Sequence, residues 1–129
     1  MSSYPMAWHI RRIDDGIIET VFEGLVSGEE MLEAAAERIR IGKVQNVTRF
    51  LLDARKMIAP RSATMDVFKI PTKVYQEQEV ERTTRIGVVP PADQDSGWIV
   101  NFYEDLCYTR GWSIKICRDR QNAIDWLKI

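Results

Sequence analysis

The chain has 129 residues, 45% of them hydrophobic, and we expect it to form one domain spanning residues 1–129. Its 18 basic and 19 acidic side chains leave a net charge of -1, which argues against nucleic-acid binding because a phosphate backbone is usually met by a concentrated basic surface. It contains no apolar run near the ~20 residues that span a bilayer and no signal-peptide core in its first residues, MSSYPMAW, so we expect a cytoplasmic protein without a membrane span.

The N-terminal segment has the pattern of a β-hairpin. Residues Trp8–Ile13 and Ile17–Phe22 predict two antiparallel strands, and Asp15-Gly16 between them is a dipeptide typical of tight hairpin turns. Arg11 and Arg12 both lie within the first strand, so this strand is predicted at or near an edge of the sheet.

A helix and a buried strand follow the hairpin. Ser27–Glu30 has the S-x-x-E form of a capping box, which predicts a helix start, and Gly42 is the expected stop. Phe50–Leu52 is a short unbroken apolar run, typical of a strand that is covered on both faces of a parallel sheet.

The middle of the chain is predicted to be irregular. Residues Asp53–Thr64 read as a loop that leaves the carboxyl end of a central strand. Between Thr64 and Gln78 a helical pattern is interrupted by Pro71, so we expect a break or two short helices instead of one straight rod.

The C-terminal part alternates strands and helices. Ile86–Val89 reads as a buried strand, and the next helix is expected to begin at a cap formed by Asp93, Asp95 or Ser96 and to end at Gly111. A strand with alternating faces then spans residues 112–117, and a last helix begins after a further cap at Asp119 and docks on the sheet. Its docking face is formed by Ala123, Ile124 and Leu127.

These elements predict an α/β fold. The order β β α β α β α β α implies a mixed, mostly parallel sheet of about five strands, with an antiparallel N-terminal hairpin and four or five helices.

Four segments of the chain carry a family resemblance. They are the hairpin IRRIDDGIIETVFEG, the strands RFLLDAR and RIGVV, and the C-terminal FYEDLCYTRGWSIKICRDRQNAIDWL. Together they resemble the STAS-like domains, relatives of the anti-sigma-factor antagonists, and more closely an uncharacterised bacterial STAS-like branch. The resemblance implies a βα superhelix similar to that of the lipid-carrying CRAL-TRIO domains.

In the antagonists the loop after the central strand carries a serine that a partner kinase phosphorylates. The matching segment here, Asp53–Thr64, lacks the Asp-Ser-Ser-Gly signature of that loop, which argues against a phosphorylation switch, and its hydroxyls also read as ordinary helix N-caps. The candidates for phosphorylation or anion binding are Ser62, Thr64, Arg55 and Arg61. Further loop-site candidates are Asp53, Lys56, Asp93 and Ser96.

The favoured function is a non-enzymatic regulatory or protein-interaction module of the STAS-like type. Its surface is expected to comprise the loop Asp53–Thr64, the broken helix after it and Trp98, at the edge where parallel strands place their binding loops. The protein partner is unknown, and Trp98 is also a candidate contact in a homodimer.

The alternative function is a small-molecule or lipid carrier with an apolar pocket near residues 57–75. Flexible methionines beside a helix break are suited to an adaptable pocket. The pocket candidates are Met57, Met65, Phe68 and Ile70.

Residues with catalytic or metal-binding chemistry are few. The chain lacks the common catalytic and metal-binding motifs, and His9 is its only histidine, so we expect no enzyme activity, no metal and no cofactor. The remaining catalytic possibility is a carboxylate pair formed by Asp53 with Asp93 or Asp95. Cys107 and Cys117 are expected to be buried, reduced thiols.

Overall fold

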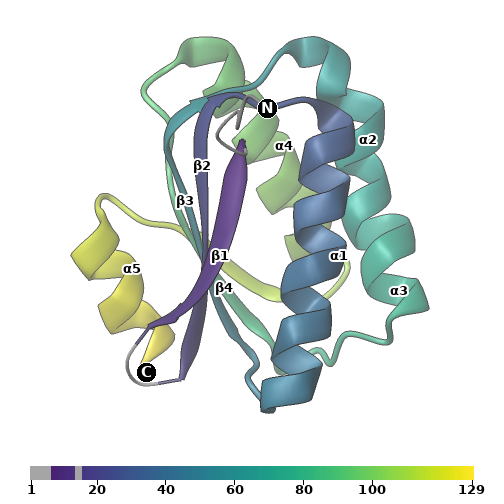
Figure 1. Cartoon of the computed structure of the whole chain (residues 1–129), viewed down its shortest axis with the longest axis vertical. Helices are drawn as coiled ribbons and strands as arrows, with labels where there is room; N and C mark the ends of the chain where they lie inside the picture. The colour runs from purple at the N-terminus through teal and green to yellow at the C-terminus, as the bar shows by residue number, and fades with distance from the viewer. Residues whose placement is uncertain (1–6, 14–15) are drawn as a thin grey trace, which may run out of the picture.

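The computed structural model describes residues 7–13 and 16–129, and within them it contains one five-stranded sheet in the order β1-β2-β3-β4-β5 (Figure 1). The strands are β1 Trp8–Ile13, β2 Ile17–Leu25, β3 Arg49–Ile58, β4 Arg85–Val89 and β5 Ser113–Ile116. β1 pairs antiparallel with β2, and every other neighbouring pair is parallel, so the predicted mixed sheet is confirmed. Asp15 of the predicted turn lies outside the described residues.

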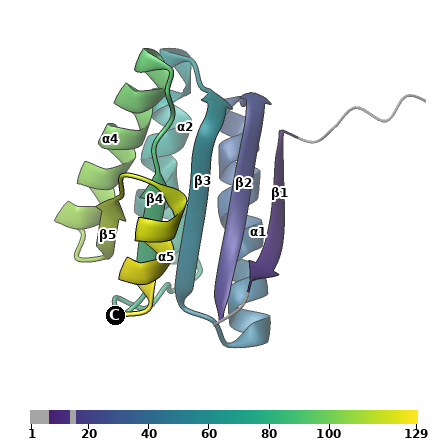
Figure 2. The same ribbon diagram turned by 90° about the vertical axis from the view of Figure 1, so that its left-hand side faces the viewer.

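The helices form two unequal layers, one on each face of the sheet. The α-helices are α1 Gly28–Gln45, α2 Thr64–Lys69, α3 Tyr75–Glu77, α4 Gln94–Thr109 and α5 Arg120–Leu127. Figure 2 shows α5 in front of the sheet, and α1, α2 and α4 behind it. None of the helices within residues 7–13 and 16–129 is long and apolar enough to cross a membrane.

Each face of the sheet buries its own core. On the side of α1, α2 and α4, the larger core includes Phe50, Leu52 and Tyr103. On the side of α5, a smaller core includes Leu51 and Leu127. Successive residues of β3 thus contribute to opposite cores, as expected for a strand covered on both faces.

Helix α1 begins as predicted but ends later. The side chain of Ser27 accepts a hydrogen bond from the backbone of Glu30, and the Glu30 side chain accepts one from the backbone of Ser27, which confirms the capping box. The predicted stop at Gly42 is wrong, because the helix continues to Gln45 and Asn46 forms a left-handed cap at φ 56°. Gly42 serves close packing instead, since a Cβ there would lie 2.6 Å from the ring of Phe50.

Strand β3 replaces most of the predicted loop Asp53–Thr64. The strand runs to Ile58, and it stays paired with β2 up to the Leu25–Ile58 pair. Only Ala59 and Pro60 separate it from a short 3-10 turn over residues 61–63. The loop prediction is therefore wrong for residues 53–58.

A β-bulge explains why this part of the strand was missed. Val21 pairs with Asp53 and Glu23 pairs with Lys56, so β3 has one residue more than β2 over the same distance. As a result Arg55 and Lys56 are both exposed. Two consecutive charged residues break the alternation by which a strand is recognised.

The helical segment after β3 is interrupted as predicted. A π-helix over Ile70–Val74 joins α2 to α3, and it contains Pro71, whose missing N–H cannot donate in a regular helix. The side chains of Val67, Ile70 and Tyr75 from this segment are buried in the larger core. The π-helix therefore keeps the apolar side chains of both α2 and α3 directed toward the larger core.

The C-terminal elements follow the prediction closely. Asp93 is the N-cap of α4, and its side chain accepts a hydrogen bond from the backbone of Ser96. Gly111 takes a left-handed conformation at φ 90° directly after α4. Asp119 caps α5 by accepting from the backbone of Asn122.

Candidate functional site

A groove of about 490 Å³ lies where β2 and β3 end and α1 and α4 begin. We call it the carboxyl-edge groove. Its lining includes Leu25, Ile58, Pro60, Glu30, Asp93 and Asp95. Leu25 is 78% exposed and Ile58 is 41% exposed, so large apolar side chains face solvent here. The groove thus combines exposed apolar side chains with carboxylates.

Hydrogen bonds around Ser96 hold the groove in shape. The backbone N–H of Ala59 donates to Ser96 Oγ at 2.7 Å, and Ser96 Oγ donates to Asp93 Oδ2 at 2.7 Å. The hydrogen bonds from Ser96 lower the pKa of Asp93, which therefore carries a negative charge at neutral pH. Ser96 itself is buried, so it positions the backbone after β3 and does not face a ligand.

Arg61 extends the groove toward Trp98. Its Nε donates to Asp95 Oδ1 at 3.1 Å, and its guanidinium lies 4.9 Å from the centre of the Trp98 ring. Trp98 stacks on Phe102 at 5.6 Å and keeps 39% of its surface exposed. Trp98 was expected on the interaction surface, and its ring lies beside the guanidinium of Arg61, which pairs with the groove carboxylate Asp95.

The predicted hydroxyls lie next to the groove but do not cap a helix. Ser62 is exposed, and the hydroxyl of Thr64 donates to the carbonyl oxygen of Arg61 at 2.5 Å. The N-cap of α2 is Ala63, without a side-chain hydrogen bond, so the N-cap interpretation of Ser62 and Thr64 is wrong.

Asp53 and Arg55 lie elsewhere, in the middle of β3. Arg55 donates from Nε to Asp53 Oδ1 at 2.9 Å and from Nη2 to Oδ2 at 2.8 Å. Burial raises the pKa of Asp53, but the hydrogen bonds and charge of Arg55 outweigh burial and lower it. Because Asp53 faces the α5 side, while α4 packs on the other side, the structure does not bring it to Asp93 or Asp95 as a carboxylate pair.

A buried carboxylate that sequence analysis missed lies on the same α5 side. Glu19 has no exposed surface, and it accepts hydrogen bonds at 2.7 Å from both Arg11 and Arg120. Burial raises the pKa of Glu19, but the two guanidinium groups outweigh burial and lower it. The available signal was a charged glutamate in the run Ile17–Phe22, which is apolar apart from Glu19 and Thr20.

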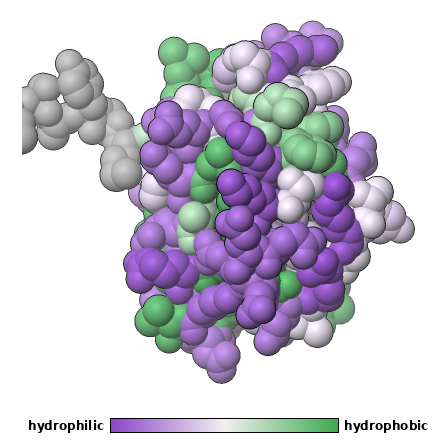
Figure 3. All heavy atoms as spheres, turned by 90° about the vertical axis from the view of Figure 1, so that its right-hand side faces the viewer, coloured by the Kyte–Doolittle hydropathy of each residue, from purple (hydrophilic) through white to green (hydrophobic). Residues whose placement is uncertain are grey.

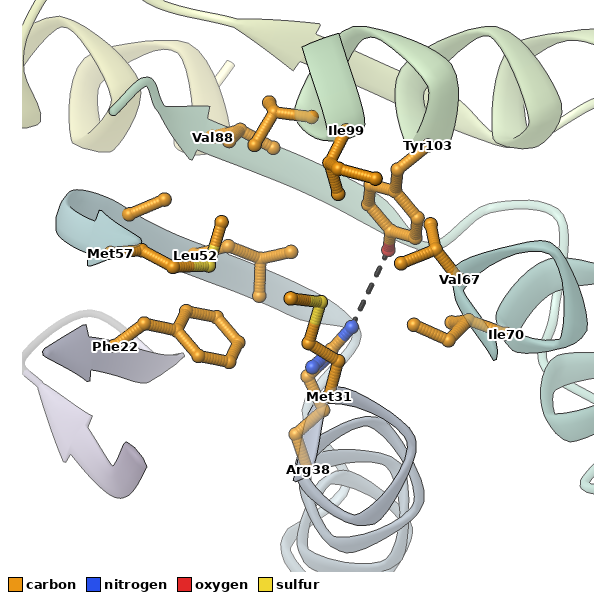
Figure 4. Close-up of a pocket in the computed structure, with 12 residues that line it drawn as sticks. Phe22, Met31, Arg38, Leu52, Met57, Val67, Ile70, Val88, Ile99 and Tyr103 are labelled. Carbon is orange, nitrogen blue, oxygen red and sulfur yellow. Dashed lines mark hydrogen bonds between the residues drawn. The ribbon is translucent and has the colours of Figure 1, made fainter. Parts of the chain in front are cut away.

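The larger core contains a cavity of about 50 Å³. Met57 and Ile70, two of the predicted pocket residues, lie in its wall together with Met31 and Phe22 (Figure 4). The other two predicted pocket residues, Met65 and Phe68, do not line this cavity. Met65 is 65% exposed and Phe68 is 38% exposed, because the face of α2 that points to the core carries Val67.

Arg38 also lines this cavity, and sequence analysis missed it. It lies on the buried face of α1, one turn from Ala34 and Gly42. Its Nη2 donates to the hydroxyl of Tyr75 at 2.7 Å and, more weakly, to that of Tyr103 at 3.5 Å. An arginine on an otherwise apolar helix face was the signal in the sequence.

Within residues 7–13 and 16–129, no three His, Cys, Asp or Glu side chains are grouped so that they could hold a metal ion. Burial raises the pKa of both thiols, that of Cys107 to about 12, so both cysteines are neutral and protonated. Both are free and buried, as predicted.

Comparisons with known proteins give structural neighbours only. No family model matches the chain, and no curated protein does. An uncharacterised protein of the DUF3478 family with a SpoIIAA-like fold, from Shewanella loihica, superposes with a TM-score of 0.59 at 19% identity, covering 98% of both chains. The unphosphorylated anti-sigma-factor antagonist SpoIIAA superposes with a TM-score of 0.55 at 11% identity, covering 95% of this chain and 98% of SpoIIAA. The chain therefore has the SpoIIAA-like, STAS-like fold that the resemblance implied.

Proposed function

We propose that the chain is a non-enzymatic regulatory module of the STAS type, and that it acts by binding a partner protein in the carboxyl-edge groove. The SpoIIAA-like fold supports the general class. The observation that carries the specific proposal is the exposure of Leu25 and Ile58 inside a groove of about 490 Å³. Exposed apolar side chains that are gathered in one place and bordered by polar groups are typical of interaction sites.

The charge of the groove indicates the chemistry of the partner. Glu30, Asp93 and Asp95 line it, and Arg61 is the guanidinium that pairs with one of these three carboxylates. The complementary surface is an apolar side chain flanked by lysine or arginine. The partner is therefore proposed to present such a segment, with its apolar side chain between Leu25 and Ile58.

Other exposed apolar side chains are less suited to docking. Figure 3 shows the face over α1 and α2, where hydrophilic side chains cover most of the centre and hydrophobic ones form separate spots. Val44, at the far end of α1, is 75% exposed but is not part of the carboxyl-edge groove. It lies 16 residues from Gly28, about 24 Å along the helix, and serves as a matched control.

A pull-down from extracts of the native cell tests the proposal, with the wild-type chain and three variants as bait. Leu25→Asp and Ile58→Asp each place a negative charge in the groove, and Val44→Asp places one outside it. We expect that a protein from the native cell binds wild type and Val44→Asp equally well. The same protein should bind Leu25→Asp and Ile58→Asp at least ~10-fold more weakly. Equal binding to all four proteins contradicts the proposal.

Light scattering of the same variants shows whether the carboxyl-edge groove binds a different protein or a second copy of this chain. The proposal predicts that Leu25→Asp and Ile58→Asp leave the mass of the purified protein unchanged at micromolar concentration. A dimer that dissociates in Leu25→Asp and Ile58→Asp, but not in Val44→Asp, would show that the groove binds another copy and would overturn the assignment to a different partner.

A further inference from the structure

We propose that the cavity beside Arg38 is a binding site for a small monoanion of the short-chain carboxylate class. The guanidinium of Arg38 forms its polar wall, and the apolar side chains of the larger core form the rest. The proposal is independent of the carboxyl-edge groove.

The first observation is a hydrogen-bond donor without a partner. Arg38 is 2% exposed, and among the residues that the structure describes its Nη1 has no hydrogen-bond partner. Buried side-chain donors are normally paired, and an unpaired one calls for an explanation, such as a bound water, molecule or ion. Arg38 is one of the residues that line the cavity, so its guanidinium group lies beside the space that a ligand would occupy (Figure 4).

The second observation is a buried positive charge without a counter-ion. The polar neighbours that Arg38 contacts are the hydroxyls of Tyr75 and Tyr103, which lie 2.7 Å from each other. Burial raises the pKa of both tyrosines, so both stay neutral at physiological pH. In the described part of the chain no carboxylate forms a salt bridge with Arg38. A buried cation is costly without an anion, because the low-polarity interior does not solvate it.

The size and lining of the cavity select the anion. Its volume of about 50 Å³ is roughly a third of the ~150 Å³ cavity that holds benzene in another protein, so an acyl chain or a nucleotide does not fit. Apart from Arg38 and Tyr103 the lining is apolar. A carboxylate of one to three carbons places its oxygens on a guanidinium and its hydrogen atom or short alkyl group against apolar walls. The flexible side chains of Met31 and Met57 can adjust to it.

The segment that covers the cavity provides a route of entry. Val67 from α2 and Ile70 from the π-helix form part of the wall. π-Helical turns often occur at functional sites, and Pro71 removes one backbone donor from this turn. Outward movement of α2 would open the cavity without disturbing the sheet.

Thermal unfolding of the whole chain tests the proposal with sodium formate, acetate and propionate as probes. Sodium chloride at the same ionic strength and acetamide are the controls. In wild type, a carboxylate is expected to raise Tm in a saturable way, by about 8 °C at 100 times its Kd, beyond any effect of chloride. Arg38→Met replaces the guanidinium with an apolar chain, and is expected to abolish this rise. No rise beyond that in chloride, or an equal rise in Arg38→Met, overturns the proposal.

A second measurement uses wild type alone, so it does not depend on folding of the variant. Methyl NMR resonances of Met31 and Met57 are expected to shift saturably on addition of acetate, while that of Met65, which is 65% exposed, stays unchanged. Resonances of Met31 and Met57 that do not move in acetate contradict the proposal.

Discussion

Glu19 on β2 and Arg120 on α5 form an ion pair across 101 positions of the chain, with Arg120 Nε 2.7 Å from Glu19 Oε2. Arg11 on the edge strand β1 joins the same carboxylate from the other side. Glu19 has no exposed surface, whereas both arginines reach solvent. A single buried carboxylate thus ties the first strand and the last helix to the sheet.

This arrangement predicts a loss of stability in acid. Because the folded state lowers the pKa of Glu19, the stabilisation is complete above its unfolded-state pKa of about 4.3 and is lost as pH falls through the lower folded-state pKa. Glu19→Gln should reduce the free energy of unfolding by about 1–3 kcal/mol at neutral pH and weaken this acid dependence. Urea unfolding between pH 3 and pH 7 measures both effects.

The control for this prediction is Glu37→Gln, which removes a surface pair with Arg40. It should change the free energy of unfolding by no more than about 0.5 kcal/mol. Equal losses in the two variants would show that burial of Glu19 does not distinguish it from a surface glutamate.

Two glycines in helices predict opposite effects of the same substitution. At Gly42 an added Cβ would lie 2.6 Å from Phe50 and 2.9 Å from the carbonyl oxygen of Val47. Gly42→Ala should therefore destabilise the protein by about 1–2 kcal/mol, because overpacking outweighs the gain in helix propensity. At Gly97 an added Cβ would have no atom within 4 Å beyond its chain neighbours and the backbone of its own helix, so Gly97→Ala should stabilise α4 by about 0.5–1 kcal/mol. Chemical denaturation of both variants measures the difference, and a stabilising Gly42→Ala would show that α1 does not pack this closely on Phe50.

The two thiols should be unreactive in the folded protein. Burial raises the pKa of Cys107 to about 12 and also raises that of Cys117, and the thiolate is the reactive form. At pH ~8 a colorimetric disulfide reagent should modify both slowly in buffer and rapidly in denaturant. Leu25→Cys, at a position 78% exposed, should add one thiol that reacts at once. Rapid modification of wild type in buffer would show that this part of the fold opens easily.

The sequence was most informative where local rules act alone. The turn at Gly111 and the cap at Asp119 were predicted because a left-handed cap and a short acceptor side chain act within a few residues. The course of β3 was not predicted, because the bulge between Asp53 and Lys56 depends on the pairing of β3 with β2, an earlier segment of the chain. Pairing across the sheet cannot be read from the residues of one strand.

The candidate site was predicted only in part for a similar reason. Asp93, Ser96 and Arg61 were named as site candidates, and the structure places them near the end of β3. Leu25 and Ile58 were not expected to share the groove, because their proximity depends on the parallel pairing of β2 and β3. Arg38 looked like one charged residue among several on α1, and its burial follows from contacts with Tyr75 and Tyr103, which come from two other helices.

Site-specific crosslinking in the native cell tests the docking role of the carboxyl-edge groove most directly. A photoreactive amino acid replaces Ile58 in one protein and Val44 in another, so that the probe lies inside the groove or at the far end of α1. Docking in the groove predicts a crosslinked partner protein from position 58 that is absent from position 44 and is lost when Leu25→Asp is added. The same crosslinked products from both positions, or none from position 58, would contradict it.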